Sequence, residues 1–278
     1  MPGVQVDGPE LFSYNEYVTS HEGSAKVYSP RREVVAGLAK GLTILEAFNP
    51  HTPQLTITTA ARAAGLSPAV ARRCLLTLES LGYLSHDGKY FRPTARLARL
   101  ASSYLSASPL PLLAQPHLAS VRDAVGESSS LGVLDGRSVT FVARAEAREV
   151  ITTGVRVGSH MPAHTSAAGR VFLSAMTEPE LDEFLEGCEF TRTGPRTLLT
   201  PELVRERVQR ARVSGFSFTD EELQPGVRSI AVPVRDSAGV TQATLSLATA
   251  SNRETISHME QAFLPVLRSE ADRLGAKL

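Results

Sequence analysis

Two short helical segments separated by only three residues constrain this chain more than any other feature. The first is predicted to begin at Thr58, which can act as its N-cap, and to end at Gly65. The second begins after Ser67, a good N-cap, with Pro68 at its first helical position. Ala61 and Gly65 lie four residues apart, and small residues at that spacing let two helices cross closely. The pattern predicts a helix-turn-helix.

A strand-turn-strand pattern follows, after Gly82. Residues 83–92 read as a hairpin with Asp87-Gly88 at its turn. A further helix is predicted before the pair, at 34–48, and its apolar face would carry Leu38, Leu42, Leu45 and Phe48. The order of these elements predicts a winged helix-turn-helix domain at 33–93. A linking helix would follow at 94–107, within a link of 94–111 that contains helix-breaking prolines.

The local charge suggests a polyanionic partner. The chain has 29 basic and 29 acidic residues, but from Arg31 to Arg99 ten basic residues stand against four acidic ones. A basic segment of this kind is typical of nucleic-acid binding, although a solvated basic surface would have the same composition. An ordinary three-helix bundle is the plain alternative to a DNA-binding domain.

The second helix of the pair is the one expected to read DNA. Its predicted buried stripe consists of Ala71, Cys74, Leu75, Leu78 and Leu81. The start of this helix enters the major groove in such motifs, where an arginine can bond a guanine edge or hold phosphate. A lysine beside the wing tip or on the first helix can hold phosphate. The predicted contacts to a double-stranded DNA operator are Lys40, Ser67, Ala69, Arg72, Arg73 and Lys89.

The remainder of the chain mixes helices and adjacent strands, which favours an α+β domain with a mainly antiparallel sheet. Helices are predicted at 116–125, 166–175, 178–185, 201–215 and 254–274, and strands at 128–134, 139–144, 150–157, 216–222, 229–234 and 241–249. Residues 1–32 have no clear period and are predicted to be a flexible tail. Neither a secretory signal nor an apolar run of membrane-spanning length is present, so a cytoplasmic location is expected. Two isolated cysteines fit a reducing compartment.

Small residues at two places predict a pocket for an acidic small molecule. On the strand at 241–249, Thr244, Ser246 and Ala248 share one face, which leaves room and offers hydrogen bonds. The segment 166–169, Ser-Ala-Ala-Gly, opens a helix with side chains too small to cover the backbone, so its free N–H groups suit a carboxylate. Tight helix–sheet packing would explain the same small residues. Arg148 is a further candidate to neutralise an acid, although an ordinary surface arginine is the favoured explanation of that residue.

Enzymatic interpretations find little support. Residues 126–130 contain serines but no GxSxG elbow. His160 and His164 are four apart, but Pro162 between them argues against a continuous metal-binding helix. No catalytic residue, metal or cofactor is therefore predicted. A small-molecule hydrolase or transferase with an accessory helical domain is the alternative, and a scaffold protein that does not bind DNA is a third possibility.

Several segments together resemble the IclR family of bacterial transcription regulators over about residues 33–278. They are 38–42, 65–67, 71–73, 161–170, 220–222 and 225–234. The resemblance implies a winged DNA-binding domain, a linker helix and a GAF-like effector-binding α/β domain at 112–278, assembled as a homodimer or homotetramer. It also implies effector contacts at Ala167, Ala168, Thr219, Val227, Ser229, Ser246 and Ala248, with Thr219 standing where relatives often carry an acid.

The subgroup is similar to the regulators of the β-ketoadipate pathway of aromatic-acid catabolism. The segments that carry this similarity are 47–49, 71–78, 126–130 and 228–236. The implied effector is a small carboxylate, either an aromatic acid or a dicarboxylic acid of that route.

Overall fold

The computed structural model describes residues 35–49, 52–147 and 155–278. The predicted flexible tail and Arg148 lie outside these residues. The described residues form two compact units, one ending at Ser108 and the other beginning at Pro109. This division falls inside the segment 94–111 that the sequence assigns to the link.

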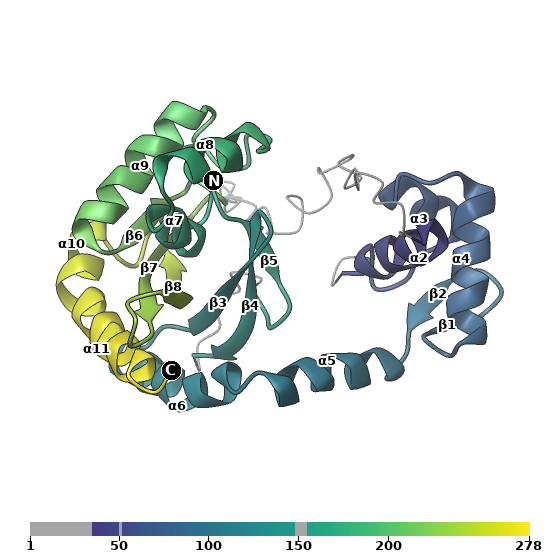
Figure 1. Cartoon of the computed structure of the whole chain (residues 1–278), viewed down its shortest axis with the longest axis horizontal. Helices are drawn as coiled ribbons and strands as arrows, with labels where there is room; N and C mark the ends of the chain where they lie inside the picture. The colour runs from purple at the N-terminus through teal and green to yellow at the C-terminus, as the bar shows by residue number, and fades with distance from the viewer. Residues whose placement is uncertain (1–34, 50–51, 148–154) are drawn as a thin grey trace, which may run out of the picture. The chain divides into compact units, whose positions relative to one another are not determined.

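The first unit has the element order expected for a winged helix-turn-helix (Figure 1). Its elements are α2 (Ala36–Glu46), α3 (Ile57–Ala63), α4 (Pro68–Ser80), β1 (Leu84–His86) and β2 (Phe91–Pro93), the last two being antiparallel. Ser67 caps α4 as predicted, with its side chain accepting from the N–H of Val70. The N-cap of α3 is Thr56 rather than Thr58, because Thr56 and Thr59 form a reciprocal capping box.

The core of this unit corrects two predicted apolar faces. Ile44 of α2 is fully buried with Leu75 and Phe91, whereas the predicted Leu38 and Leu42 are 64% and 49% exposed. The α4 stripe is buried at Ala71, Leu75 and Leu78, but Leu81 at its C-cap is 51% exposed. The apolar face of α2 was misplaced because Ile44, which packs against α4, is out of phase with the leucine spacing.

A break of only a few residues separates the linking helix from the next helix. Helix α5 (Arg96–Ala107) stops at Ser108, whose φ of −110° and ψ of 111° are extended. Helix α6 (Leu110–Val125) then begins six residues earlier than the predicted Pro116. The prolines of this segment predict a break in the helix, but Pro111 stands in the first turn of α6, where its missing N–H is tolerated, and Pro116 lies within the helix.

The second unit is built on a six-stranded sheet in the order β5-β4-β3-β8-β7-β6, and every neighbouring pair is antiparallel, as predicted. The strands are β3 (Ser129–Asp135), β4 (Ser138–Ala145), β5 (His160–Pro162), β6 (Ser217–Asp220), β7 (Val227–Arg235) and β8 (Thr241–Ala250). Strand β5 was not predicted, and it places His160 on a strand. Most of the strand predicted at 150–157 lies outside the described residues.

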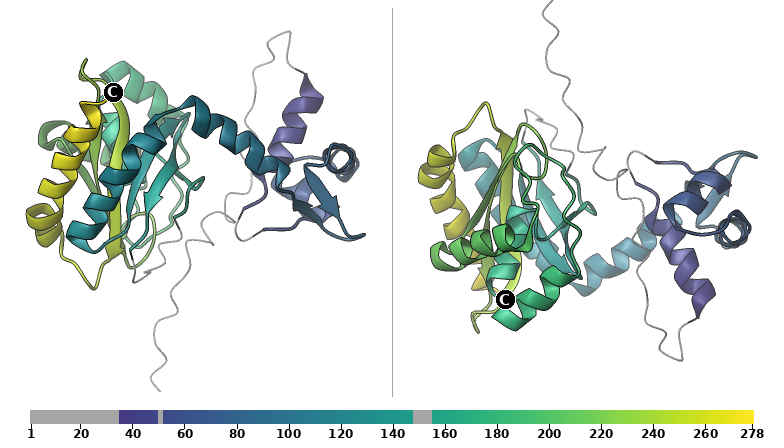
Figure 2. Two further views of the ribbon diagram at one scale, coloured as in Figure 1. Left: turned by 90° about the horizontal axis from the view of Figure 1, so that it is seen from below. Right: turned by 90° about the horizontal axis from the view of Figure 1, so that it is seen from above.

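Helices cover the sheet on two sides (Figures 1 and 2). One side packs α6 and α11 (Leu264–Gly275), which follows α10 (Ile256–His258) and a π-helical turn at Met259–Phe263. The other side packs α7 (Ala167–Ser174), α8 (Glu178–Glu186) and α9 (Pro201–Ser214). These three helices have their N-caps at Ser166, Thr177 and Thr200. In the described part of the chain, no helix has the length and apolarity needed to cross a bilayer.

Candidate functional site

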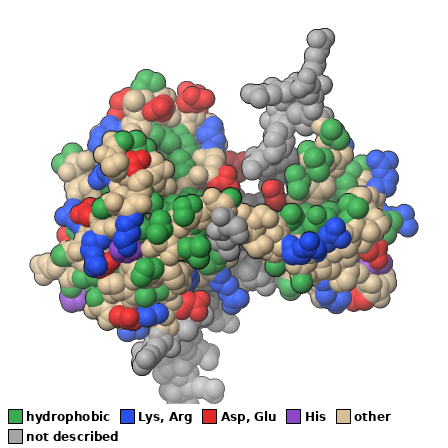
Figure 3. Space-filling model, turned by 60° about the horizontal axis from the view of Figure 1, so that its bottom comes forward, with side chains coloured by type: hydrophobic (Ala, Val, Ile, Leu, Met, Phe, Trp, Pro, Cys, Tyr) green, Lys and Arg blue, Asp and Glu red, His purple; other side chains and the backbone are tan. Residues whose placement is uncertain are grey.

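The start of α4 presents the residues expected to contact DNA. Ser67, Ala69, Arg72 and Arg73 are all exposed, while Ala71 on the opposite face is fully buried. The cap explains which residues are exposed and which are buried. Ser67 fixes where α4 begins, and the 3.6-residue period then turns both arginines away from the core. Lys40, on α2, is exposed as well. Figure 3 shows Lys and Arg side chains gathered on the surface of this unit.

The wing turn is held by one carboxylate. Asp87 accepts hydrogen bonds from the backbone N–H groups of Tyr90 at 2.8 Å and Lys89 at 3.0 Å, and from the Arg92 guanidinium at 2.5 Å. The backbone bond from Tyr90 and the Arg92 contact hold the pKa of Asp87 well below its ordinary value. Arg92 also donates to Gln54 at 2.6 Å, so its charge is engaged within the wing. Lys89 is exposed beside the tip, with Nζ 4.9 Å from the centre of the Tyr90 ring.

The second unit contains a pocket of about 580 Å³, part of it open to solvent, between the sheet and the start of α7. All seven residues that the family resemblance implied as effector contacts line it. They come from α7, β6, β7 and β8: Ala167, Ala168, Thr219, Val227, Ser229, Ser246 and Ala248. On β8, Leu245 and Leu247 pack into the core with α6 and α11, as predicted. Ser246 and Ala248 of the predicted open face line the pocket, whereas Thr244 is fully buried and does not line it.

The first turn of α7 offers backbone donors to the pocket. Ser166 accepts from the N–H of Gly169 at 3.0 Å, and Arg170 N–H bonds to the Ser166 carbonyl. The N–H groups of Ala167 and Ala168 find no acceptor among the described residues. Gly169 has a separate role, because a Cβ there would lie 2.1 Å from the Cα of Ala163. The small residues therefore divide into two alanines that line the pocket and one glycine that permits close packing.

Arg144, on β4, is the principal pocket residue that the sequence did not reveal. Its side chain is only 9% exposed, and Nη1 donates to Ser130 Oγ at 2.8 Å. Its Nε is buried and makes no hydrogen bond to any described residue. The Glu146 carboxylate lies 3.8 Å from Nε but is itself 65% exposed. Burial lowers the pKa of Arg144, partly offset by Glu146. The pocket thus holds a desolvated guanidinium with unused hydrogen-bonding capacity.

Residues with hydroxyl groups lie on the strands β3, β8, β7 and β6, which come after β4 in the sheet. Ser130 pairs across the strands with both Arg144 and Ser246. Thr219 and Ser229, an adjacent pair on β6 and β7, hydrogen-bond to each other at 2.6 Å. Other residues that sequence reasoning missed are Ser130, Phe141, Val155, Met161, Leu223, Gln224 and Leu247. The sequence signal that could have drawn attention to Arg144 is that it is the one charged residue of β4.

A basic winged helix-turn-helix, together with a separate unit containing a small-molecule pocket, defines a ligand-responsive transcription regulator. Two family models match the chain: the IclR helix-turn-helix domain over residues 37–88, and the bacterial transcriptional regulator IclR C-terminal domain over residues 102–276. The chain therefore belongs to the IclR family of DNA-binding transcription regulators. This membership favours a regulator over the hydrolase, transferase and scaffold alternatives.

The chain is similar to regulators of aromatic catabolism. It is 35% identical to the Pca regulon regulatory protein of Pseudomonas putida over 236 residues, covering 84% of this chain and 81% of that one. It is 34% identical to the p-hydroxybenzoate hydroxylase transcriptional activator of Acinetobacter baylyi over 266 residues, covering 94% and 97%. An IclR homolog from Microbacterium hydrocarbonoxydans, complexed with 4-hydroxybenzoate, has a TM-score of 0.72 and 28% identity, covering 87% of this chain and 99% of that one.

Proposed function

We propose that this chain regulates transcription of aromatic-acid catabolism genes from the cytoplasm, and that its effector is an aromatic carboxylate bound at Arg144. The observation that carries the proposal is the buried guanidinium whose Nε makes no hydrogen bond to any described residue, in a pocket largely walled by apolar groups. A buried cation of this kind is stabilised by a carboxylate, which can accept two parallel N–H bonds from the planar fork.

The rest of the pocket suits the remainder of such a ligand. Phe141, Met161 and Val227 offer apolar contacts to an aromatic ring. The N–H groups of Ala167 and Ala168 offer two further donors, as do the hydroxyls of Ser229 and Ser246. The curated relatives and the complex with 4-hydroxybenzoate support an aromatic acid over an aliphatic dicarboxylate for this chain.

On the DNA side, we propose that Arg72 and Arg73 contact base edges and that Lys40 and Lys89 hold phosphate. Their exposure at the start of α4, on α2 and beside the wing tip supports this assignment. Ser67 and Ala69 would lie at the same contact, Ser67 setting the position of α4.

A homodimer or larger homo-oligomer would read two half-sites of one operator. Leu100 and Tyr104 of α5 are exposed large apolar residues available for that contact, as are Leu38 and Leu42 of α2.

The test is titration calorimetry of the intact protein with protocatechuate, 4-hydroxybenzoate and β-ketoadipate, followed by gel shift with the promoter of its own gene. The neutral amide 4-hydroxybenzamide is the matched control for charge. At least one aromatic acid should bind, the amide should bind far more weakly, and the binding acid should change the affinity for DNA. If β-ketoadipate alone binds, the effector is a dicarboxylate; if the amide binds as tightly as its acid, Arg144 does not select for charge.

A further inference from the structure

A short loop contributes two residues to the pocket wall. It runs from Glu221 to Gly226, between β6 and β7, and its Leu223 and Gln224 line the pocket. Glu221 is the one non-glycine residue with positive φ in the described chain, at 54°, an uncommon conformation that surrounding contacts must hold. Its N–H bonds to the Val227 carbonyl at 2.9 Å, and its carboxylate accepts from Gly226 N–H at 3.0 Å.

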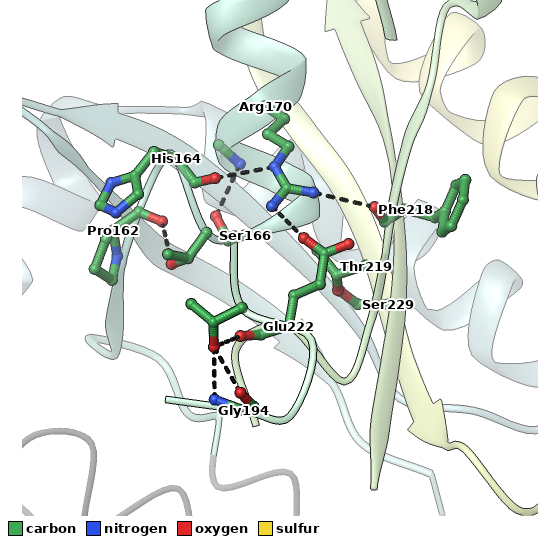
Figure 4. Close-up of polar contacts among 12 residues, drawn as sticks. Pro162, His164, Ser166, Arg170, Gly194, Phe218, Thr219, Glu222 and Ser229 are labelled. Atoms are coloured by element: carbon green, nitrogen blue, oxygen red, sulfur yellow. Dashed lines mark hydrogen bonds and ion pairs between the residues drawn. The ribbon is translucent and has the colours of Figure 1, made fainter. Parts of the chain in front are cut away.

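One buried ion pair joins this loop to the helix that forms another wall of the pocket (Figure 4). Arg170, in α7, is fully buried and its guanidinium pairs with the carboxylate of Glu222, which is 3% exposed. The same guanidinium donates from Nε to the His164 carbonyl at 2.9 Å, just before the cap of α7. Arg170 therefore contacts both the segment that precedes α7, at His164, and the loop 221–226, at Glu222.

The outer side of the loop is anchored as well. The Glu222 carbonyl accepts from Thr197 Oγ1 at 2.7 Å and from Thr193 Oγ1 at 3.2 Å. A Cβ on Gly194 would lie 2.2 Å from the Glu221 carbonyl oxygen, so this segment packs directly on the loop backbone. Glu222 is therefore held on both sides, by Arg170 through its carboxylate and by Thr193 and Thr197 through its carbonyl.

We propose that Arg170 and Glu222 are the positioning pair of the effector site. They fix the distance between the first turn of α7, with its free N–H groups, and the loop 221–226. Neither side chain lines the pocket; they act through Ala167 and Ala168 on one side and Leu223 and Gln224 on the other. Breaking the pair leaves one buried charge uncompensated, and both walls loosen together. The inference rests on the proposed function only in taking this pocket as the effector site.

The test compares Glu222→Gln with Glu270→Gln in the full-length protein. Glu270 is a matched control, because its carboxylate is also buried, with the residue only 6% exposed, and accepts hydrogen bonds from His117 and Ser120. It lies between α6 and α11, on the other side of the sheet. Hydrogen exchange of the empty protein is measured at the hydrogen-bonded amides of two segments, Gly169 and Arg170 in α7 and Glu221 and Gly226 in the loop. E222Q should speed exchange in both segments by about tenfold or more, and E270Q in neither.

Calorimetry with 4-hydroxybenzoate supplies the second readout. The dissociation constant should rise by about tenfold or more in E222Q, yet stay within about twofold of the parent in E270Q, because distant sites act independently. The proposal is overturned if E222Q loosens one segment without the other, or if E270Q loosens both as strongly. Exchange needs no ligand, so failure of 4-hydroxybenzoate to bind the parent protein would count against the proposed function alone.

Discussion

Replacing Arg144 with methionine should lower the affinity for the effector without lowering the stability of the empty protein. The guanidinium would lose a buried, charge-assisted contact to the effector carboxylate, and such truncations cost about 2–5 kcal/mol. Because each 1.4 kcal/mol is a factor of ten, the dissociation constant for the acid should increase by a factor of between about 30 and a few thousand. Calorimetry with 4-hydroxybenzoate measures this directly.

The empty protein should tolerate the same change. Arg144→Met removes one hydrogen bond, from Nη1 to Ser130 at 2.8 Å, but it also removes a desolvated charge whose Nε has no acceptor among the described residues. Apolar residues of similar volume often replace buried ions without loss of stability. The contact with Glu146 adds little, since that carboxylate is mostly exposed. The melting temperature of the empty variant should therefore equal or exceed that of the parent.

Two controls separate charge recognition from damage to the pocket. Glu146→Gln should leave affinity for the acid within about fivefold of the parent, because an exposed partner contributes at most about 1 kcal/mol. The parent should prefer 4-hydroxybenzoate strongly over 4-hydroxybenzamide, and Arg144→Met should bind the two alike. If the variant keeps the preference of the parent for the acid over the amide, another group neutralises the carboxylate and the reasoning is refuted.

The other predictions concern DNA, pocket access and assembly. Arg72→Ala and Arg73→Ala should each weaken operator binding by about 1–3 kcal/mol with the melting temperature unchanged, and a salt-matched gel shift in which the double variant binds like the parent would reject the contact. Ala168→Leu should abolish calorimetric binding of the acid while DNA retention persists, because a leucine fills space at the pocket wall; undiminished binding would place the ligand elsewhere. Light scattering at micromolar concentration should give at least a dimer mass, and Leu100→Glu with Tyr104→Glu should lower it; a monomeric parent protein would contradict the proposal.

Local signals in the sequence were sufficient for most of the helices. Ser67 before Pro68 marked a cap that the structure confirms, and the helix predicted at 201–215 agrees with α9. These features depend on hydrogen bonds within one turn, so a single segment contains all the information. Strand β5 at His160–Pro162 escaped prediction because three residues carry no period, and its pairing with β4 is a contact between separate segments.

The pocket shows where local information ends. An unbroken hairpin register continuing from Asp135 opposite Ser138 would set Arg144 opposite Ser129, whose hydroxyl bonds to Leu118 of α6 on the far side of the sheet. A register shift between Leu131 and Gly132 instead pairs Arg144 with Ser130, in the pocket. One extra residue in β4 thus selects the face on which the charge lies, and no residue in that strand announces the bulge.

The close approach at Gly169 limits how this pocket can diversify. Because no larger residue fits against Ala163, position 169 must stay glycine for α7 to keep its packing on the segment before it. Descendants of this chain that come to recognise a bulkier or smaller metabolite must therefore change the strand and loop side chains opposite α7. Drift in effector range should accumulate at positions such as Thr219, Leu223 and Ala248 while the helix start stays constant.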